Sequence, residues 1–135
     1  MNPNGKCYIV GLNPIPDTFD GDGDVFCRVT KIRDACILLA GHRCYREYPI
    51  EWVVRSLEQA GFVVDSTKRF PILYTAGSMI RQINVARSKL QFFRNSELRE
   101  GMRSELDKLE LEAHRACPEG KKIKLGFDYV VCASI

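Results

Sequence analysis

The chain has 135 residues, which fits one globular domain of the usual ~100–200 residues. Hydrophobic residues make up 45% and charged residues 27%, which excludes wholesale disorder, and a net charge of +3 is too small to indicate a polyanionic partner. The sequence has no apolar run of the ~20 residues that a spanning helix needs and no basic-then-apolar signal pattern. We therefore expect a cytoplasmic protein that contacts no membrane.

The first expected element is a short strand over Lys6–Leu12, which is bounded by turn residues and apolar on both faces. It ends at Asn13-Pro14-Ile15-Pro16, because proline donates no hydrogen bond to a strand ladder. A loop follows, in which Asp20, Asp22 and Asp24 stand at alternate positions. These aspartates imitate the start of a calcium loop, but Val25 stands where the turn glycine belongs and Lys31 where the bidentate glutamate belongs. A solvated acidic loop is expected instead.

Two helices and a strand are expected next. Apolar residues from Ile32 to Leu39 share one helical face, which favours a helix over 25–39. A second helix begins with Pro49 at its first helical position and ends before Gly61, which suits a left-handed cap. Its apolar stripe consists of Ile50, Val53, Val54, Leu57 and Ala60. A strand opens at Phe62 and runs toward Ile72, so the strand–helix–strand order predicts a parallel pair with a right-handed crossover.

Two further helices and a last strand complete the pattern. Apolar residues repeat at three- and four-residue steps over 78–93 and again over about 97–116, where Ser96 or Asn95 can cap the start. The segment Phe127–Ala133 is a short apolar run typical of a buried strand. The first of these helices, together with Arg94 just after it, carries four basic residues and no acid, and the second has a net charge of −2. We expect the acidic helix to neutralise the basic one, so nucleic-acid binding is not expected.

The cysteines do not form a metal-binding pattern. No C-x-x-C pair occurs, and the nearest arrangement, Cys36-x5-His42-x-Cys44, has irregular spacing. We therefore expect free thiols in a reducing compartment and no metal site. A nucleophilic pair of Cys44 and His42 is also not favoured, because residues two apart rarely face each other on a helix or strand. The sequence contains no glycine-rich phosphate loop and no known hydrolase motif.

Three segments together resemble class I S-adenosylmethionine-dependent methyltransferases. Pro3–Gly11 resembles the turn and fifth strand of that family, and Trp52–Val64, with its Ala60-Gly61-Phe62 end, looks like the next crossover helix and sixth strand. Phe127–Ala133 looks like the last strand. The resemblance covers roughly half of the chain.

The resemblance implies an α/β fold, namely a partial Rossmann-like methyltransferase sheet of three strands. Its order is first strand, last strand, middle strand, with the last one antiparallel and central. A two-helix insertion over about 78–117 precedes the last strand. Residues 1–135 would then form a single methyltransferase-like C-terminal domain fragment.

The resemblance also implies what this chain lacks. The family holds its cofactor with a glycine-rich turn after its first strand and an acidic residue at the end of its second. Here the match begins at the fifth strand, so no cofactor-binding residue transfers. S-adenosylmethionine is therefore the expected cofactor of the parent fold, none is expected for this chain alone, and the catalytic residues are unassigned.

Two functions follow as expectations. The first is the C-terminal portion of an S-adenosylmethionine-dependent methyltransferase, which is incomplete as an enzyme by itself. The alternative is a non-catalytic interaction module. It would use the 78–116 helices to bind a protein or, as a weaker option, RNA. The candidate substrate-side residues are Asn13, Asp17, His42 and Tyr45. The first two follow the first strand, and the last two precede the helix that begins at Pro49. The open edge at residues 6–12 is expected to take a missing N-terminal half or to self-associate.

Overall fold

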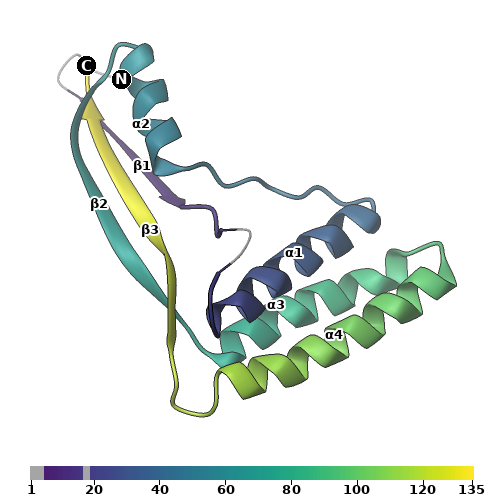
Figure 1. The fold of residues 1–135 in the computed structure, drawn as a ribbon. Coiled ribbons are helices and arrows are strands. Elements are labelled where there is room, and N and C mark those ends of the chain that lie inside the picture. Colours follow the sequence, from purple (N-terminus) through teal and green to yellow (C-terminus); the bar gives the residue numbers. More distant parts are fainter. Residues whose placement is uncertain (1–4, 17–18) are drawn as a thin grey trace. The chain divides into compact units, whose positions relative to one another are not determined.

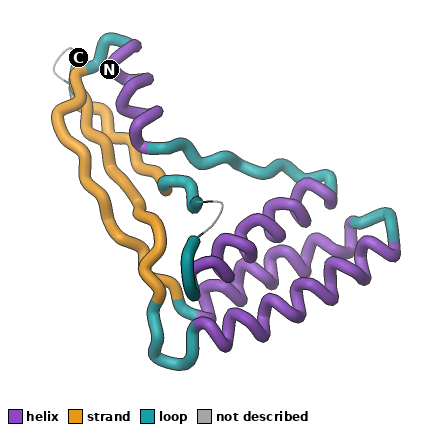
Figure 2. Tube along the Cα trace, viewed as in Figure 1, coloured by secondary structure: helices purple, strands orange, loops and turns teal. Residues whose placement is uncertain are grey.

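The computed structural model describes residues 5–16 and 19–135 of the chain. Contacts divide these residues into two compact units. The first, which we call the sheet unit, holds the described residues up to Ile15 together with Arg46–Ile72 and Leu125–Ile135. The second, the helical unit, holds the described residues of Pro16–Tyr45 and all of Leu73–Lys124. Figure 2 distinguishes the strands of the first from the helices that dominate the second.

Three strands form one sheet in the order β1-β3-β2 within the described residues. They are β1 (Lys6–Leu12), β2 (Val63–Tyr74) and β3 (Ile123–Ser134). β1 pairs antiparallel with β3, and Figure 1 shows β1 and β2 running in one direction on either side of the opposed β3. The predicted order, with the last strand central and antiparallel, is therefore confirmed.

One face of this sheet is covered by α2 (Ile50–Gln59). Its buried Ile50, Val53 and Leu57 pack against β3 side chains that alternate along the strand, which are Tyr129, Val131 and Ala133. The stripe predicted from helical spacing is thus the stripe that is buried. Pro49 is the residue before the helix rather than its first residue, and Gly61 has φ +91°, as the predicted left-handed cap requires.

The other face of β1 is largely exposed. The sequence predicts a strand that is apolar on both faces, yet 64% of Tyr8 and 72% of Val10 are exposed. Their neighbours Cys7 and Ile9 point to the other face and are partly buried. The strand therefore has no charged residue after Lys6, but among the described residues it is packed on one side only.

The helical unit is built from α1 (Gly23–Leu39), α3 (Ala76–Lys89), a short 3-10 turn over Leu90–Phe92, and α4 (Ser96–Ala116). The predicted helix over 25–39 is confirmed, and it packs against both α3 and α4. α3 begins two residues before the predicted position because Thr75 and Ser78 form a capping box. Asn95 caps α4 by accepting a hydrogen bond from the Leu98 amide. No described helix has the combination of length and apolar character needed to cross a bilayer.

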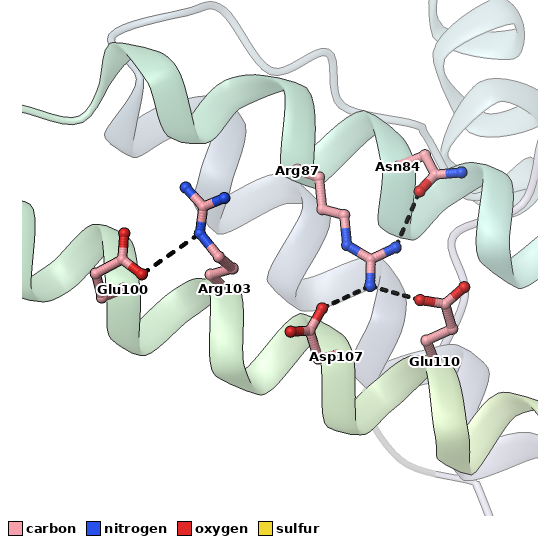
Figure 3. Close-up of polar contacts among 6 residues, drawn as sticks. All are labelled: Asn84, Arg87, Glu100, Arg103, Asp107 and Glu110. Carbon is pink, nitrogen blue, oxygen red and sulfur yellow. Dashed lines mark hydrogen bonds and ion pairs between the residues drawn. The ribbon is translucent and has the colours of Figure 1, made fainter.

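Charge pairs join the helices of this unit. The Arg87 guanidinium of α3 donates to Asp107 at 2.8 Å and to Glu110 at 2.5 Å, both on α4 (Figure 3). Arg28 of α1 pairs with Glu112 of α4, and its hydrogen bond holds the pKa of the Glu112 carboxyl below the ordinary value of 4.5. The acidic helix therefore neutralises at least Arg87 of the basic helix, as its charge predicts.

The Arg28–Glu112 pair predicts a pH-dependent stability difference. Glu112→Gln should lower the melting temperature at neutral pH, by the equivalent of at most about 1 kcal/mol, because both side chains are substantially exposed. A carboxyl with a lowered folded pKa stabilises the protein above its unfolded pKa and loses that contribution as the pH falls through the folded value. The two melting curves, recorded by circular dichroism, should therefore converge below about pH 4.5.

A matched control for this measurement is Glu105→Gln, whose partner Lys108 lies on the same helix. This substitution should change stability by no more than a few tenths of a kcal/mol. A difference between Glu112→Gln and the wild type that persists in strong acid would show that the ion pair is not its cause.

Candidate binding groove

A groove of about 440 Å³ runs between β1 and α2 in the sheet unit. One wall is the β1 backbone from Ile9 to Leu12, the other is α2 and the segment that precedes it, and Tyr129 lies at the bottom. The lining is mainly apolar, with Arg46 and Glu47 as its charged members. The full lining is Ile9, Val10, Gly11, Leu12, Arg46, Glu47, Tyr48, Trp52, Val53, Ser56, Leu57 and Tyr129. Such a lining suits an apolar or aromatic surface better than a charged ligand.

Two aromatic rings stand at the α2 side of the groove. Tyr48 and Trp52 stack with their ring centroids 4.6 Å apart and their planes 21° from parallel. Their four-residue separation across the start of α2 brings the two rings side by side. About half of each side chain is exposed, 51% for Tyr48 and 52% for Trp52. This pair is the largest exposed aromatic surface in the groove.

The bottom of the groove depends on a close approach between two strands. Tyr129 of β3 lies directly opposite Gly11 of β1, and a Cβ added to Gly11 would come within 2.6 Å of the Tyr129 hydroxyl. The phenol donates a hydrogen bond of 2.7 Å to the Tyr48 carbonyl. Burial and, secondarily, the nearby Glu47 carboxylate raise the pKa of Tyr129, so the phenol keeps the proton that it donates.

The four residues proposed from the sequence do not line this groove. The side-chain oxygen of Asn13 accepts a hydrogen bond of 3.1 Å from the Ile50 amide, which places it at the amino terminus of α2 in the sheet unit. Asp17 lies outside the described residues. His42 and Tyr45 belong to the helical unit, where His42 Nδ1 is 3.0 Å from Lys89 Nζ and 81% of Tyr45 is exposed beside Arg43. Their role as substrate-side residues therefore stays a prediction.

Some of the groove residues could have been predicted from the sequence. Trp52 lies off the apolar stripe of α2, and a large aromatic residue outside such a stripe indicates a surface with some other task. Tyr129 gave no such signal, because a tyrosine in an apolar strand is usual in a core. Its position depends on a glycine 118 residues earlier in the sequence.

The helical unit has a smaller apolar surface of its own. Leu38, Leu39, Phe92 and Leu98 are each more than 40% exposed and border a hollow of about 380 Å³ where α1 ends and α4 begins. We call these four residues the tip patch. Among the described residues, no group of three or more potential metal ligands comes together.

Comparisons with known proteins found no matching family model and no matching curated protein. One solved structure with a similar chain is that of a "putative methyltransferase" from Bacillus halodurans, with 14% sequence identity and a TM-score of 0.43. The match covers 98% of this chain and 56% of that one. The present chain therefore spans little more than half the length of that protein.

Gly11 yields a prediction about the bottom of the groove. Gly11→Ala should destabilise the fold by about 1–3 kcal/mol, because the new Cβ would displace the buried Tyr129 ring and its hydrogen bond. Gly101→Ala, at an open position in α4, should instead stabilise it by about 0.5–1 kcal/mol. Urea denaturation measures both free energies of unfolding. The cost of Gly11→Ala should shrink in a Tyr129→Phe background, and an unchanged cost would contradict the proposed clash.

A second prediction concerns Asn13 as a long-range cap. Asn13→Ala should lower the free energy of unfolding by about 1 kcal/mol, because the Ile50 amide loses its acceptor. Asn13→Asp keeps an acceptor oxygen at the positive end of α2 and should retain most of the stability. Equal stability of the wild type and Asn13→Ala in urea denaturation would count against the capping role.

Proposed function

We propose that this chain is the C-terminal portion of an S-adenosylmethionine-dependent methyltransferase-like protein. The observation that carries the proposal is the strand order, in which a final antiparallel strand lies between two parallel ones. A meander would have produced the order β1-β2-β3. The observed order requires a crossover helix between β1 and β2 and a later strand that returns between them, and it is the arrangement implied by the resemblance of the three sequence segments.

The position of the loop after β1 supports a substrate-side role for its residues. In α/β sheets, ligands bind beyond the carboxyl ends of parallel strands. β1 and β2 are the parallel strands here, and in chain order β1 is followed by α1 and β2 by α3. Asn13 and Asp17 follow β1 in the sequence, and His42 and Tyr45 lie between α1 and α2; all four stay proposed substrate-side residues.

The residues present do not fit the cofactor of such an enzyme. The loop after β1 contains Pro14 and Pro16, which lack the backbone N–H groups that a cradle for the cofactor would need. The chain also has no G-x-G-x-G turn after a strand. We therefore propose that S-adenosylmethionine binds to a complementary N-terminal half, and we derive no chemical step for this chain alone.

The test of this proposal is the genomic sequence upstream of the codon for Met1, since direct titration of this chain with S-adenosylmethionine should give no binding under either candidate function. We expect an upstream strand followed by an acidic residue and a G-x-G-x-G turn, in the same frame or in an adjoining gene. A polypeptide with that motif should copurify with this chain and bind S-adenosylmethionine in isothermal titration calorimetry. Absence of the motif from the whole neighbourhood would overturn the proposal.

The alternative function is an interaction module, and the tip patch is the observation that favours it. Four large apolar side chains exposed at one end of a three-helix unit are typical of a protein-binding surface. RNA is the weaker candidate, because Arg87 of the basic helix is already paired with two carboxylates of α4. Salt-dependent retention on immobilised RNA would distinguish the two partners.

A further inference from the structure

The outer edge of β1 has a defined set of unpaired backbone groups. Where β1 and β3 pair, the numbers of two opposite residues sum to 140, as for Ile9 and Val131. The Asn13 amide donates a hydrogen bond to the Phe127 carbonyl in the same register. Backbone direction alternates along a strand, so the odd-numbered residues of β1 bond to β3. The even-numbered residues therefore turn their N–H and C=O groups away from β3. These residues are Lys6, Tyr8, Val10 and Leu12.

This edge lacks the features that usually prevent pairing. It has no proline, no acidic residue and a single lysine at its first position. The two side chains in its middle, Tyr8 and Val10, are also the most exposed apolar ones in the strand. Within the described residues, β1 is an end strand of the sheet.

The edge is complementary to itself. In an antiparallel pair of two β1 strands centred on Ile9, each even-numbered residue lies opposite another one, so their free backbone groups can exchange hydrogen bonds. Tyr8 then faces Val10 of the second copy, an aromatic–β-branched pair that stabilises sheets. Lys6 faces Leu12, so no like charges meet. Registers shifted by one pair of residues to either side would leave backbone groups at one end of each strand unpaired.

The groove also favours a second copy of this chain as the partner of the β1 edge. α2 packs over β3, so a sheet continued through β1 would hold the two copies of α2 three strand spacings apart, about 14 Å. Helices in direct contact lie ~8–10 Å apart. The gap must be filled by large side chains, and Tyr48 and Trp52 extend into the groove on this side of each helix.

We propose that the β1 edge is a homodimer interface, in which two copies join antiparallel around Ile9 and fill the groove with Tyr48 and Trp52. This proposal is argued from the register and the side chains of β1, whereas the methyltransferase proposal is argued from strand order and tested by an upstream motif. A partner with a parallel strand, such as an N-terminal half, is the competing occupant of the same edge.

Sedimentation equilibrium of the full chain tests the association. The wild type should form a dimer whose fraction rises with concentration, and fluorescence of Trp52, the single tryptophan, should shift to shorter wavelength as the dimer forms. Val10→Pro removes an outward N–H group without touching the bonds to β3 and should leave a folded monomer. Val10→Lys should do the same, and its matched control Val63→Lys, at an exposed valine of the other outer strand, should still dimerise.

Crosslinking tests the register. In a Cys7→Ser background, Ile9→Cys places two thiols opposite each other, with Cα atoms about 4.5 Å apart, within disulfide range. Val10→Cys places its thiol opposite Tyr8 of the second copy and should crosslink poorly. A wild type that stays monomeric at about 1 mM, or dimers that survive Val10→Pro, would overturn the proposal. Occupation of the edge by a strand of a different polypeptide would overturn it as well, whatever the upstream sequence contains.

Discussion

The hydrogen bond from the Tyr129 hydroxyl to the Tyr48 carbonyl joins three parts of the sheet unit that are distant in sequence. Tyr129 belongs to the central strand, its ring lies over Gly11 of β1, and its hydroxyl holds the segment that leads into α2. Because Pro49 follows Tyr48 directly, this bond also holds the chain immediately before the helix starts. The core under α2, the groove and the stacked aromatic pair therefore depend on one phenol that fits only where the opposite strand has no side chain.

Much of the fold was predictable because local signals agreed with one another. The apolar stripe of α2, the glycine after it and the strand that opens directly after that glycine all indicated the same crossover, and the structure has it. The central position of the last strand was not predictable from periodicity, since the same three strands could form a meander. It came from the order of segments that resemble a known family. Helix starts shifted by one or two residues where a cap, such as the Thr75–Ser78 box, involves side chains rather than apolar spacing.

The site was predicted less well than the fold. Asn13 was singled out because it follows a strand, but its oxygen caps α2, whose first residue lies 37 positions later. Nothing near Asn13 in the sequence indicates that partner. The groove residues were missed for the same reason, since Tyr129 and Gly11 have meaning only as a pair brought together by the sheet. Charge gave a better result, because two oppositely charged helices in succession predicted the contact of Arg87 with α4.

The alternation within β1 has a consequence for how this segment can change over evolutionary time. Cys7, Ile9 and Gly11 face the α2 side and bond to β3, so their substitution is limited by the interior of the protein. Substitution of Tyr8 and Val10 is limited only by what lies outside the sheet. Two different constraints therefore act on alternate residues of one seven-residue strand. Across relatives, variation at the odd positions should follow the core, whereas variation at the even positions should follow the partner.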